Sequence, residues 1–174
     1  VLKEKRNETV KKVELLQAVG RENFTEMAAR LFPWPDEETV RQARQDLRKA
    51  KWGKAKSPYF DFRQLKKIFE WRFGQYGLNW QVDGQEVSGN KLSVNKKGAL
   101  NLGKETHFSL ERTMTAVVHE IDTHVLRTEN GRLQPLKVFQ TGLPGYTETE
   151  EGLAVYRVNK LGLNILKVFI PQIR

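Results

Sequence analysis

Apolar residues recur at three- and four-residue intervals through the first half of the chain, with short polar stretches between the runs. This spacing places apolar side chains on one face of a helix, and it predicts helices at about residues 4–19, 22–31 and 36–50. Pro35 would open the third helix at its first turn. The acidic residues at 36–38 would then lie at the positive end of that helix.

A fourth helix is predicted at about residues 62–73, because the apolar residues there follow a period of 3.6. The stripe consists of Phe62, Leu65, Ile68, Phe69 and Phe73. A stripe of this kind is typical of a helix face buried in a hydrophobic core, and we do not interpret it as a cofactor site.

The pattern changes between Leu78 and Gly103, where apolar and polar residues alternate and glycine-bearing turns interrupt them. The segments LNWQVDGQEV, KLSVN and ALNLG predict two or three antiparallel strands, the last two joined in a hairpin by a KKG turn. Ser109 is a good N-cap for the helix that follows. These elements predict an α+β fold that is mainly helical, with a small antiparallel sheet ahead of that helix.

The chain has 174 residues, of which 39% are hydrophobic, and this is enough for one well-filled core. We therefore predict a single domain over residues 1–174, with a helical part at 1–76 and a sheet plus helices at 77–174. The chain begins with Val1 and ends in the apolar segment ILKVFIPQIR. Both ends favour a fragment of a longer protein, truncated at the C-terminus.

The sequence contains no cysteine, so any zinc ion must be held by histidine and carboxylate. The N-terminal segment VLKEKRNETVKK is too charged for a signal peptide. No apolar run approaches the roughly 18 residues of a membrane-spanning helix. We therefore predict a cytoplasmic protein with no membrane partner.

The net charge of +9 is concentrated between Arg41 and Lys67, where ten basic residues stand against two acidic ones. Trp52, Tyr59 and Phe60 are interleaved with these charges. Such a basic block can be a solvated helix face, a surface that steers an acidic peptide toward the protein, or a surface that binds phosphates and stacks on bases. No recognised nucleic-acid motif accompanies it, which disfavours nucleic acid as a partner.

The segment AVVHEIDTHVLR contains His119, Glu120 and His124, and thus two of the three histidines of the chain. Familiar zinc peptidases carry HExxH, because a spacing of four brings both imidazoles to one helix face. Here the spacing is five, and five steps of about 100° leave the two rings roughly 140° apart on a regular helix. The segment is therefore either a metal site on an irregular helix or an accident of sequence.

Catalytic zinc usually takes three protein ligands plus water, and the segment GYTETEEGLAVYRV offers further carboxylates. Thr147 and Glu150 fit a capping box at the start of a helix, which would occupy Glu150 and leave Glu151 free. Taken alone, Glu151 also fits an acid stabilised by the positive end of a helix. Together with the two histidines, it is the candidate third ligand.

Three ordered motifs, HEIDTHVLR, NGRLQPL and GLPGYTETEEGLAVY, resemble a family of metallopeptidases that includes the microtubule-associated tyrosine carboxypeptidase and bacterial relatives with a QEGLA motif. The resemblance covers roughly residues 80–160. It implies a zincin-like helix pair, with His119, His124 and Glu151 as zinc ligands and Glu120 as the catalytic carboxylate. Glu150 stands where QEGLA has glutamine, so it competes with Glu151 for the role of third ligand.

The activity implied by the resemblance is zinc-dependent release of a C-terminal residue, aromatic or otherwise bulky, from a protein tail. Zinc would lower the pKa of its bound water toward about 7, and Glu120 would pass a proton from that water to the leaving amine. If His119 and His124 share one ion, the helix must depart from regular geometry. We predict a π-bulge, which lets five residues cover nearly one turn.

A carboxypeptidase must also hold the free carboxylate of its substrate. Arg127 is a candidate for this contact, although it can instead bond helix carbonyls or a neighbouring acid. Gln134 and Tyr146 are further candidates for polar contacts with substrate. The ALNLG strand could pair with the peptide backbone as an added strand, and an acidic tail would suit the basic block.

The sequence also bears on His107, on Asp122 and on two alternative functions. His107 is expected to be structural or exposed, and Asp122 is expected to be a supporting or solvated acid and not a ligand. An inactive or truncated zinc-binding interaction module stays open as a function, as does a basic nucleic-acid-binding module. Zinc content, peptide turnover and salt-sensitive binding of DNA or RNA distinguish these alternatives.

Overall fold

The computed structural model describes residues 1–32, 34–49, 59–86, 92–95 and 97–161. The chain divides into two compact units, Val1–Lys54 and Ala55–Arg174. The helix at 62–75, which the sequence grouped with the N-terminal helical part, belongs to the second unit. A single domain over the whole chain stays a prediction.

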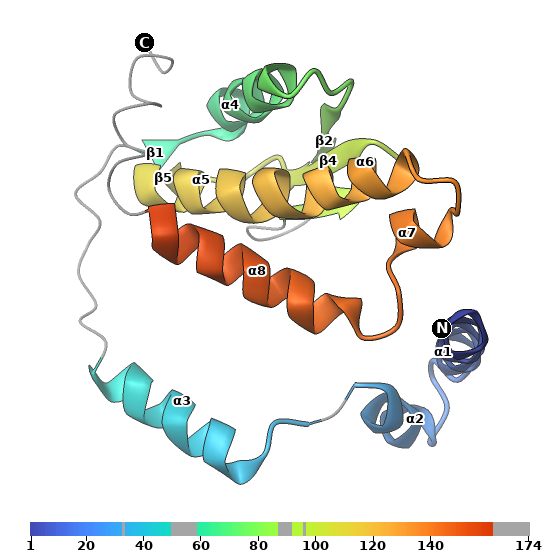
Figure 1. The fold of residues 1–174 in the computed structure, drawn as a ribbon. Coiled ribbons are helices and arrows are strands. Elements are labelled where there is room, and N and C mark those ends of the chain that lie inside the picture. The colour runs from blue at the N-terminus through green and yellow to red at the C-terminus, as the bar shows by residue number, and fades with distance from the viewer. Residues whose placement is uncertain (33, 50–58, 87–91, 96, 162–174) are drawn as a thin grey trace. The chain divides into compact units, whose positions relative to one another are not determined.

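The described part of the first unit contains α1 (Leu2–Gln17), α2 (Phe24–Leu31) and α3 (Glu37–Lys49) (Figure 1). All three helices lie close to their predicted bounds. The Oδ1 atom of Asp36 accepts a hydrogen bond from the backbone N–H of Thr39 at 2.7 Å. Asp36 therefore caps α3, and Pro35 lies before the helix instead of in its first turn.

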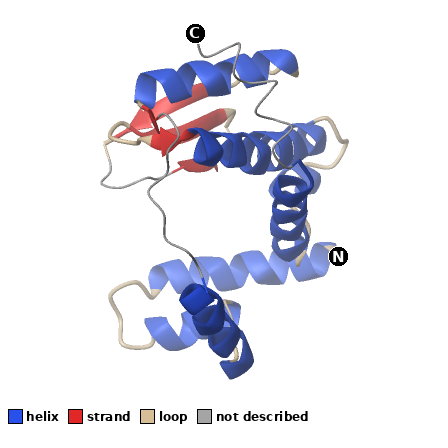
Figure 2. Ribbon diagram, turned by 90° about the vertical axis from the view of Figure 1, so that its left-hand side faces the viewer, coloured by secondary structure: helices blue, strands red, loops and turns tan. Residues whose placement is uncertain are grey.

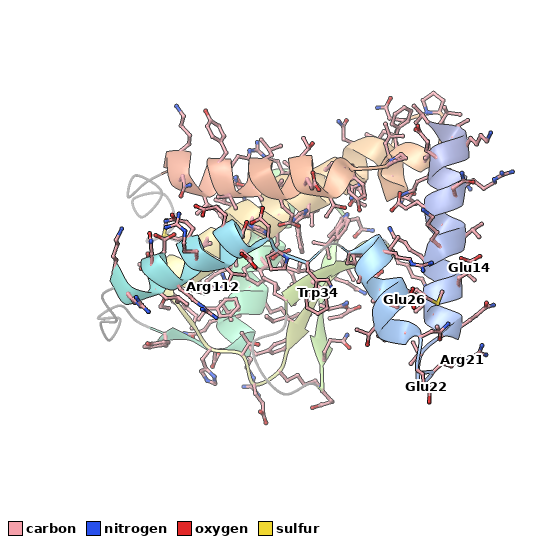
Figure 3. The ribbon with its side chains drawn as sticks, turned by 90° about the horizontal axis from the view of Figure 1, so that it is seen from below. Glu14, Arg21, Glu22, Glu26, Trp34 and Arg112 are labelled. Carbon is pink, nitrogen blue, oxygen red and sulfur yellow. The ribbon has the colours of Figure 1, made fainter. Side chains whose placement is uncertain are left out.

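Charged side chains of the first unit lie at its surface. Arg21 and Glu22 are exposed in the turn after α1 (Figure 3). Glu26 of α2 pairs with Arg30 at 2.5 Å. The basic residues of α3 are exposed as well. Residues 50–58 of the basic block lie outside the described residues, so the three interpretations of this block stay open.

The second unit begins with the strand β1 (Tyr59–Phe60), which pairs antiparallel with β5 (Phe108–Ser109). The helix α4 (Phe62–Gln75) follows and opens with a capping box, in which Asp61 and Gln64 satisfy each other's backbone N–H groups. Four residues of its predicted apolar stripe are buried, namely Leu65, Ile68, Phe69 and Phe73. The stripe is thus a core face, as predicted.

The sheet contains β2 (Gln81–Gln85), β3 (Leu92–Asn95) and β4 (Ala99–Gly103) in the order β2-β4-β3. The hairpin of β3 and β4 and the α+β class are confirmed. The sheet is not purely antiparallel, because β2 runs parallel to β4. β4 occupies the centre because it is the most apolar of the three strands, with Ala99, Leu100 and Leu102 buried.

A long helix follows β5 and is built from α5 (Leu110–Ala116), η1 (Val117–Val125) and α6 (Leu126–Arg132). The Oγ atom of Ser109 accepts a hydrogen bond from the backbone N–H of Arg112 at 3.2 Å, which confirms the predicted N-cap. The short α7 (Val138–Thr141) leads into α8 (Tyr146–Leu161), which lies alongside η1 (Figure 1). Figure 2 shows the strands of the sheet beside this helical layer.

A single hydrophobic cluster joins α4, the sheet and the long helix. α4 contacts β2 and η1, and η1 also contacts β3. The cluster includes Phe69, Phe73, Leu100, Leu102, Phe108, Val117, Ile121 and Val125. Because these residues fix η1 against the sheet, they also fix the side chains that η1 carries on its other face. No helix in the described part of the chain is long and apolar enough to span a membrane.

Asp122 lies in the buried part of η1 and not in solvent. Arg72 of α4 donates from Nε and Nη2 to the two carboxylate oxygens of Asp122 at 2.9 and 2.7 Å. The backbone carbonyl of Asp122 also accepts a hydrogen bond from Arg157 of α8. Asp122 therefore ties three helices together, and it is not part of the candidate metal cluster formed by described residues.

Candidate metal centre

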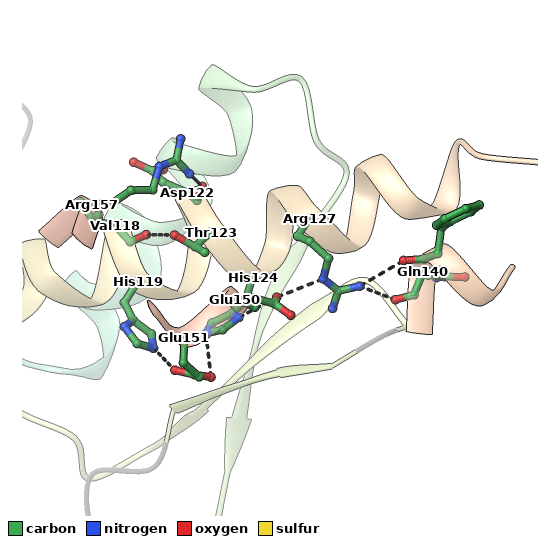
Figure 4. A network of polar contacts seen from close by, with 11 residues as sticks. Val118, His119, Asp122, Thr123, His124, Arg127, Gln140, Glu150, Glu151 and Arg157 are labelled. Atoms are coloured by element: carbon green, nitrogen blue, oxygen red, sulfur yellow. Dashed lines mark hydrogen bonds and ion pairs between the residues drawn. The ribbon is translucent and has the colours of Figure 1, made fainter. Parts of the chain in front are cut away.

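The predicted irregularity of the helix is confirmed and extends over Val117–Val125, which form a π-helix. Hydrogen bonds of this helix reach back five residues, so side chains five positions apart share a face. The rings of His119 and His124 accordingly have centroids 5.0 Å apart and planes inclined at 65°. The threonine between them, Thr123, follows the same spacing, because its hydroxyl donates to the carbonyl of Val118 at 3.0 Å (Figure 4).

Glu151 of α8 completes a three-residue cluster with these histidines. Its Oε2 lies 3.2 Å from Nε2 of His119, and its Oε1 lies 3.4 Å from Nε2 of His124 (Figure 4). The three side chains each offer a ligand atom within 4.8 Å of the other two. Two donors bound to a tetrahedral zinc ion at their usual distances lie roughly 3.3 Å apart, so this arrangement fits one ion.

Glu150 does not form the predicted capping box. The helix α8 begins at Tyr146, so Thr147 lies inside it and cannot be its N-cap. Glu150 is instead buried, and its Oε1 lies 2.8 Å from Nδ1 of His124 and 3.0 Å from Nε of Arg127. The two adjacent acids thus meet opposite nitrogens of one imidazole, Glu150 at Nδ1 and Glu151 at Nε2.

Glu120 follows the first histidine and is half-buried. Burial raises its pKa, because the charged carboxylate loses solvation. Nearby His119 and His124 act in the opposite direction, and the carboxylate of Glu151 raises the pKa again. The net shift of the Glu120 pKa is upward.

A cleft of about 340 Å³ opens over the cluster. One wall is the strand β3, and the other is formed by η1, α6 and the start of α8. The lining residues are Leu92, Ser93, Val94, His119, Glu120, His124, Arg127, Thr128, Tyr146, Thr147, Glu150 and Glu151. The cleft therefore combines three candidate metal ligands, a carboxylate beside them and an apolar edge.

A family model for the microtubule-associated tyrosine carboxypeptidase matches residues 1–158. The chain belongs to this family. No curated protein and no solved structure matches the chain. The match includes residues of both compact units. The similarity to the tyrosine carboxypeptidase family therefore covers more of the chain than residues 80–160, where the three motifs lie.

In this member of the tyrosine carboxypeptidase family, Arg127 is already engaged. Its Nε donates to Glu150, and its Nη1 donates to the carbonyls of Gln140 at 2.6 Å and Phe139 at 3.4 Å (Figure 4). Arg127 thus makes contacts of the kind given by the alternative prediction, with a neighbouring acid and with carbonyls, and its contact with substrate stays a prediction. Its Nη2 makes no hydrogen bond to the described residues, and the side chain still lines the cleft.

Tyr146 and Gln134 have different positions. Tyr146 lines the cleft, and its ring lies 5.1 Å from the guanidinium carbon of Arg127. Gly142 makes room for that ring, since a Cβ atom there would meet it at 2.3 Å, and the φ of 87° also favours glycine. Gln134 is exposed, donates to the carbonyl of Asn130 at 3.2 Å and is not among the residues that line the cleft.

Two further expectations concern the sheet and the third histidine. The ALNLG strand, β4, cannot accept a substrate strand, because both of its edges are already paired. Among the described strands of that sheet, β3 is the edge strand that faces the cleft. His107 is exposed and its Nδ1 lies 3.0 Å from the carbonyl of Glu105, in agreement with a structural or exposed histidine.

The sequence interpretation missed two kinds of cleft residue. The β3 residues Leu92, Ser93 and Val94 were assigned to a strand without a role at the site. Thr128 is buried in the cleft wall, and its hydroxyl has no hydrogen-bond partner in the described part of the chain. Thr128 lies four residues after His124, and this helical spacing could have indicated that it lies near the site. No local feature of the sequence indicates that the β3 residues line the cleft.

Proposed function

We propose that the protein is a zinc-dependent carboxypeptidase that releases a C-terminal aromatic residue from a protein tail. The observation that carries this proposal is the convergence of His119, His124 and Glu151 beneath one cleft, with Glu120 beside them. A set of two histidines and one glutamate is a known catalytic zinc site. Membership in the tyrosine carboxypeptidase family supports the same chemistry.

When bound, zinc supplies Lewis-acid chemistry, which acidifies water and polarises the carbonyl of the peptide bond. His119, His124 and Glu151 would hold the ion. Glu120 would take a proton from the attacking water on its carboxylate and then donate it to the leaving amine. The half-buried position of Glu120 beside the cluster, in the lining of the cleft, supports this role.

The cleft also offers groups for binding the end of a peptide. Leu92, Val94 and Tyr146 give it apolar surface for a terminal aromatic side chain. The Nη2 of Arg127 would donate to the terminal carboxylate. β3 would pair with the peptide backbone through the edge that has no partner among the described strands. A substrate contact by Gln134 stays a prediction, without support from its position.

The exposed arginines of α3 favour an acidic tail as the substrate, since opposite charges accelerate encounter. Such a substrate would be met in the cytoplasm, and we propose that location for the protein. This part of the proposal predicts that hydrolysis of acidic peptides slows with added salt.

Zinc content and peptide release together test the proposal. The purified chain should contain about one zinc ion, and His119→Ala should lose it. The zinc-loaded protein should release the last residue from peptides that end in a free aromatic residue. Zinc binding without release would leave an interaction module, and a chain that binds no zinc but binds DNA or RNA would contradict the proposal.

A further inference from the structure

Among the described residues, the carboxylate of Glu150 makes the shortest side-chain contact to the ring of either histidine of the cluster. Its Oε1 lies 2.8 Å from Nδ1 of His124, and only 8% of its side chain is exposed. The opposite ring nitrogen, Nε2, faces Glu151 at 3.4 Å. The imidazole of His124 is therefore held between two carboxylates, one on each nitrogen (Figure 4).

We infer that Glu150 is a positioning residue that fixes the tautomer and the orientation of His124. This inference rests on the proposed function. An ionised carboxylate only accepts hydrogen bonds, so Nδ1 of His124 must be the donor in this contact. In a neutral imidazole the other nitrogen then carries the lone pair, and Nε2 is directed toward the position that a metal would share with Glu151.

Arg127 holds Glu150 in place for this task. The Oε1 atom that faces His124 also accepts a hydrogen bond from Nε of Arg127 at 3.0 Å. The same guanidinium is anchored on its other side by the carbonyls of Gln140 and Phe139. The turn around α7 thus fixes Arg127, Arg127 fixes Glu150, and Glu150 fixes the ring.

The planar guanidinium is suited to this arrangement. It donates in two directions at a fixed angle, toward a carboxylate through Nε and toward carbonyls through Nη1. A lysine ammonium carries no such fixed geometry.

His119 differs from His124 in its contacts with carboxylates. Within the described residues, His119 has no carboxylate on a second ring nitrogen, since its ion-pair contact is with Glu151 through Nε2. The positioning by Glu150 is therefore specific to His124.

The experiment compares Glu150→Ala and Glu150→Gln with the wild-type chain. Glu148→Ala is the matched control, because Glu148 is an exposed acid of the same helix, two residues before Glu150, and does not line the cleft. The first readout is the tautomer of His124 by long-range proton–nitrogen NMR of the metal-free protein at about pH 8, above the ordinary histidine pKa of about 6.5. The chain has three histidines, so the signals can be assigned by substitution. The second readout is zinc affinity by competition with a chelator.

In the wild-type chain we expect His124 protonated at Nδ1. Glu150→Ala should lose this preference and weaken zinc binding by about 10- to 100-fold. Glu150→Gln should keep the tautomer and lose less affinity, because the amide oxygen still accepts from Nδ1. Glu148→Ala should change neither readout.

Unchanged tautomer and zinc affinity in a folded Glu150→Ala variant would overturn the inference. If that variant does not fold, a wild-type His124 protonated at Nε2 would overturn it equally. A wild-type chain that binds no zinc would refute the proposed function, while the tautomer in the metal-free protein would still decide the role of Glu150.

Discussion

His119 and His124 are five residues apart in the chain, yet their ring centroids lie 5.0 Å apart on one face of a helix. The π-helical stretch Val117–Val125 is the reason, because its hydrogen bonds reach back five residues instead of four. Irregular helices of this kind recur at functional sites. In this protein the irregularity brings the two imidazoles to the carboxylate of Glu151 on the facing helix.

Replacement of Glu120 by glutamine should separate catalysis from metal binding. The amide cannot accept the proton of the attacking water, so kcat should fall by about 10²- to 10⁴-fold. Zinc content should stay near the wild-type value, because Glu120 is outside the cluster of His119, His124 and Glu151. Peptide release and zinc analysis on the same preparation measure both effects. Wild-type turnover in this variant would show that another group is the base.

Arg127→Ala should weaken hydrolysis of peptides with a free C-terminal carboxylate more than hydrolysis of their amidated counterparts. A hydrogen bond to a charged group contributes about 1.5–3 kcal/mol, so kcat/KM for free-acid peptides should fall by roughly 10- to 100-fold through this contact. Peptides that differ only in their C-terminal amidation provide the measurement. The wild-type protein should strongly prefer the free acid.

An equal loss for both peptides would mean that Arg127 acts only through Glu150. Equal cleavage of both peptides by the wild-type protein would instead indicate an endopeptidase. Thermal unfolding of Arg127→Ala identifies a general loss of folding.

Arg72→Met should destabilise the fold, because it leaves the carboxylate of Asp122 buried without its partner. The pair is bidentate, and the side chains of Arg72 and Asp122 are 22% and 10% exposed. Breaking a buried ion pair from one side costs about 3 kcal/mol. Urea unfolding should show this loss, and the double variant Arg72→Met with Asp122→Leu should recover part of it. A stability loss below about 1 kcal/mol would place the pair among ordinary surface ion pairs.

The stability of the second unit should decline in acid through Glu129. Burial raises the pKa of Glu129, but hydrogen bonds from Arg132 and from Nε1 of Trp80 outweigh burial and lower it below its ordinary value of 4.5. The folded state therefore binds this proton less readily than the unfolded state. The resulting stability is fully present above pH 4.5 and is lost as the pH falls through the folded-state pKa.

Glu129→Gln should flatten this part of the pH dependence. Urea unfolding at a series of pH values below neutrality measures it, with Glu148→Ala as a control for an exposed acid. If the free energy of unfolding of Glu129→Gln depends on pH as in the wild-type chain, the loss of stability in acid comes from other carboxylates.

The sequence by itself determined the elements whose causes are local. The period of 3.6 located α4 and its buried face, the KKG turn between alternating segments located the hairpin, and Ser109 marked the start of the long helix. Each of these signals lies within a few residues of the structure that it specifies. The candidate ligands His119, His124 and Glu151 were also found this way, from residue types and spacing.

The tertiary structure alone decided which distant residues meet. The sequence placed Glu150 in a capping box and Asp122 among supporting or solvated acids, and it offered the ALNLG strand for pairing with a substrate backbone. Packing instead buries Glu150 against His124 and Asp122 against Arg72, and it encloses the ALNLG strand between two neighbours. A buried charge or a central strand is stable only with its partners in place, and those partners are supplied by other elements of the fold. The spacing of residues within one segment does not identify these partners.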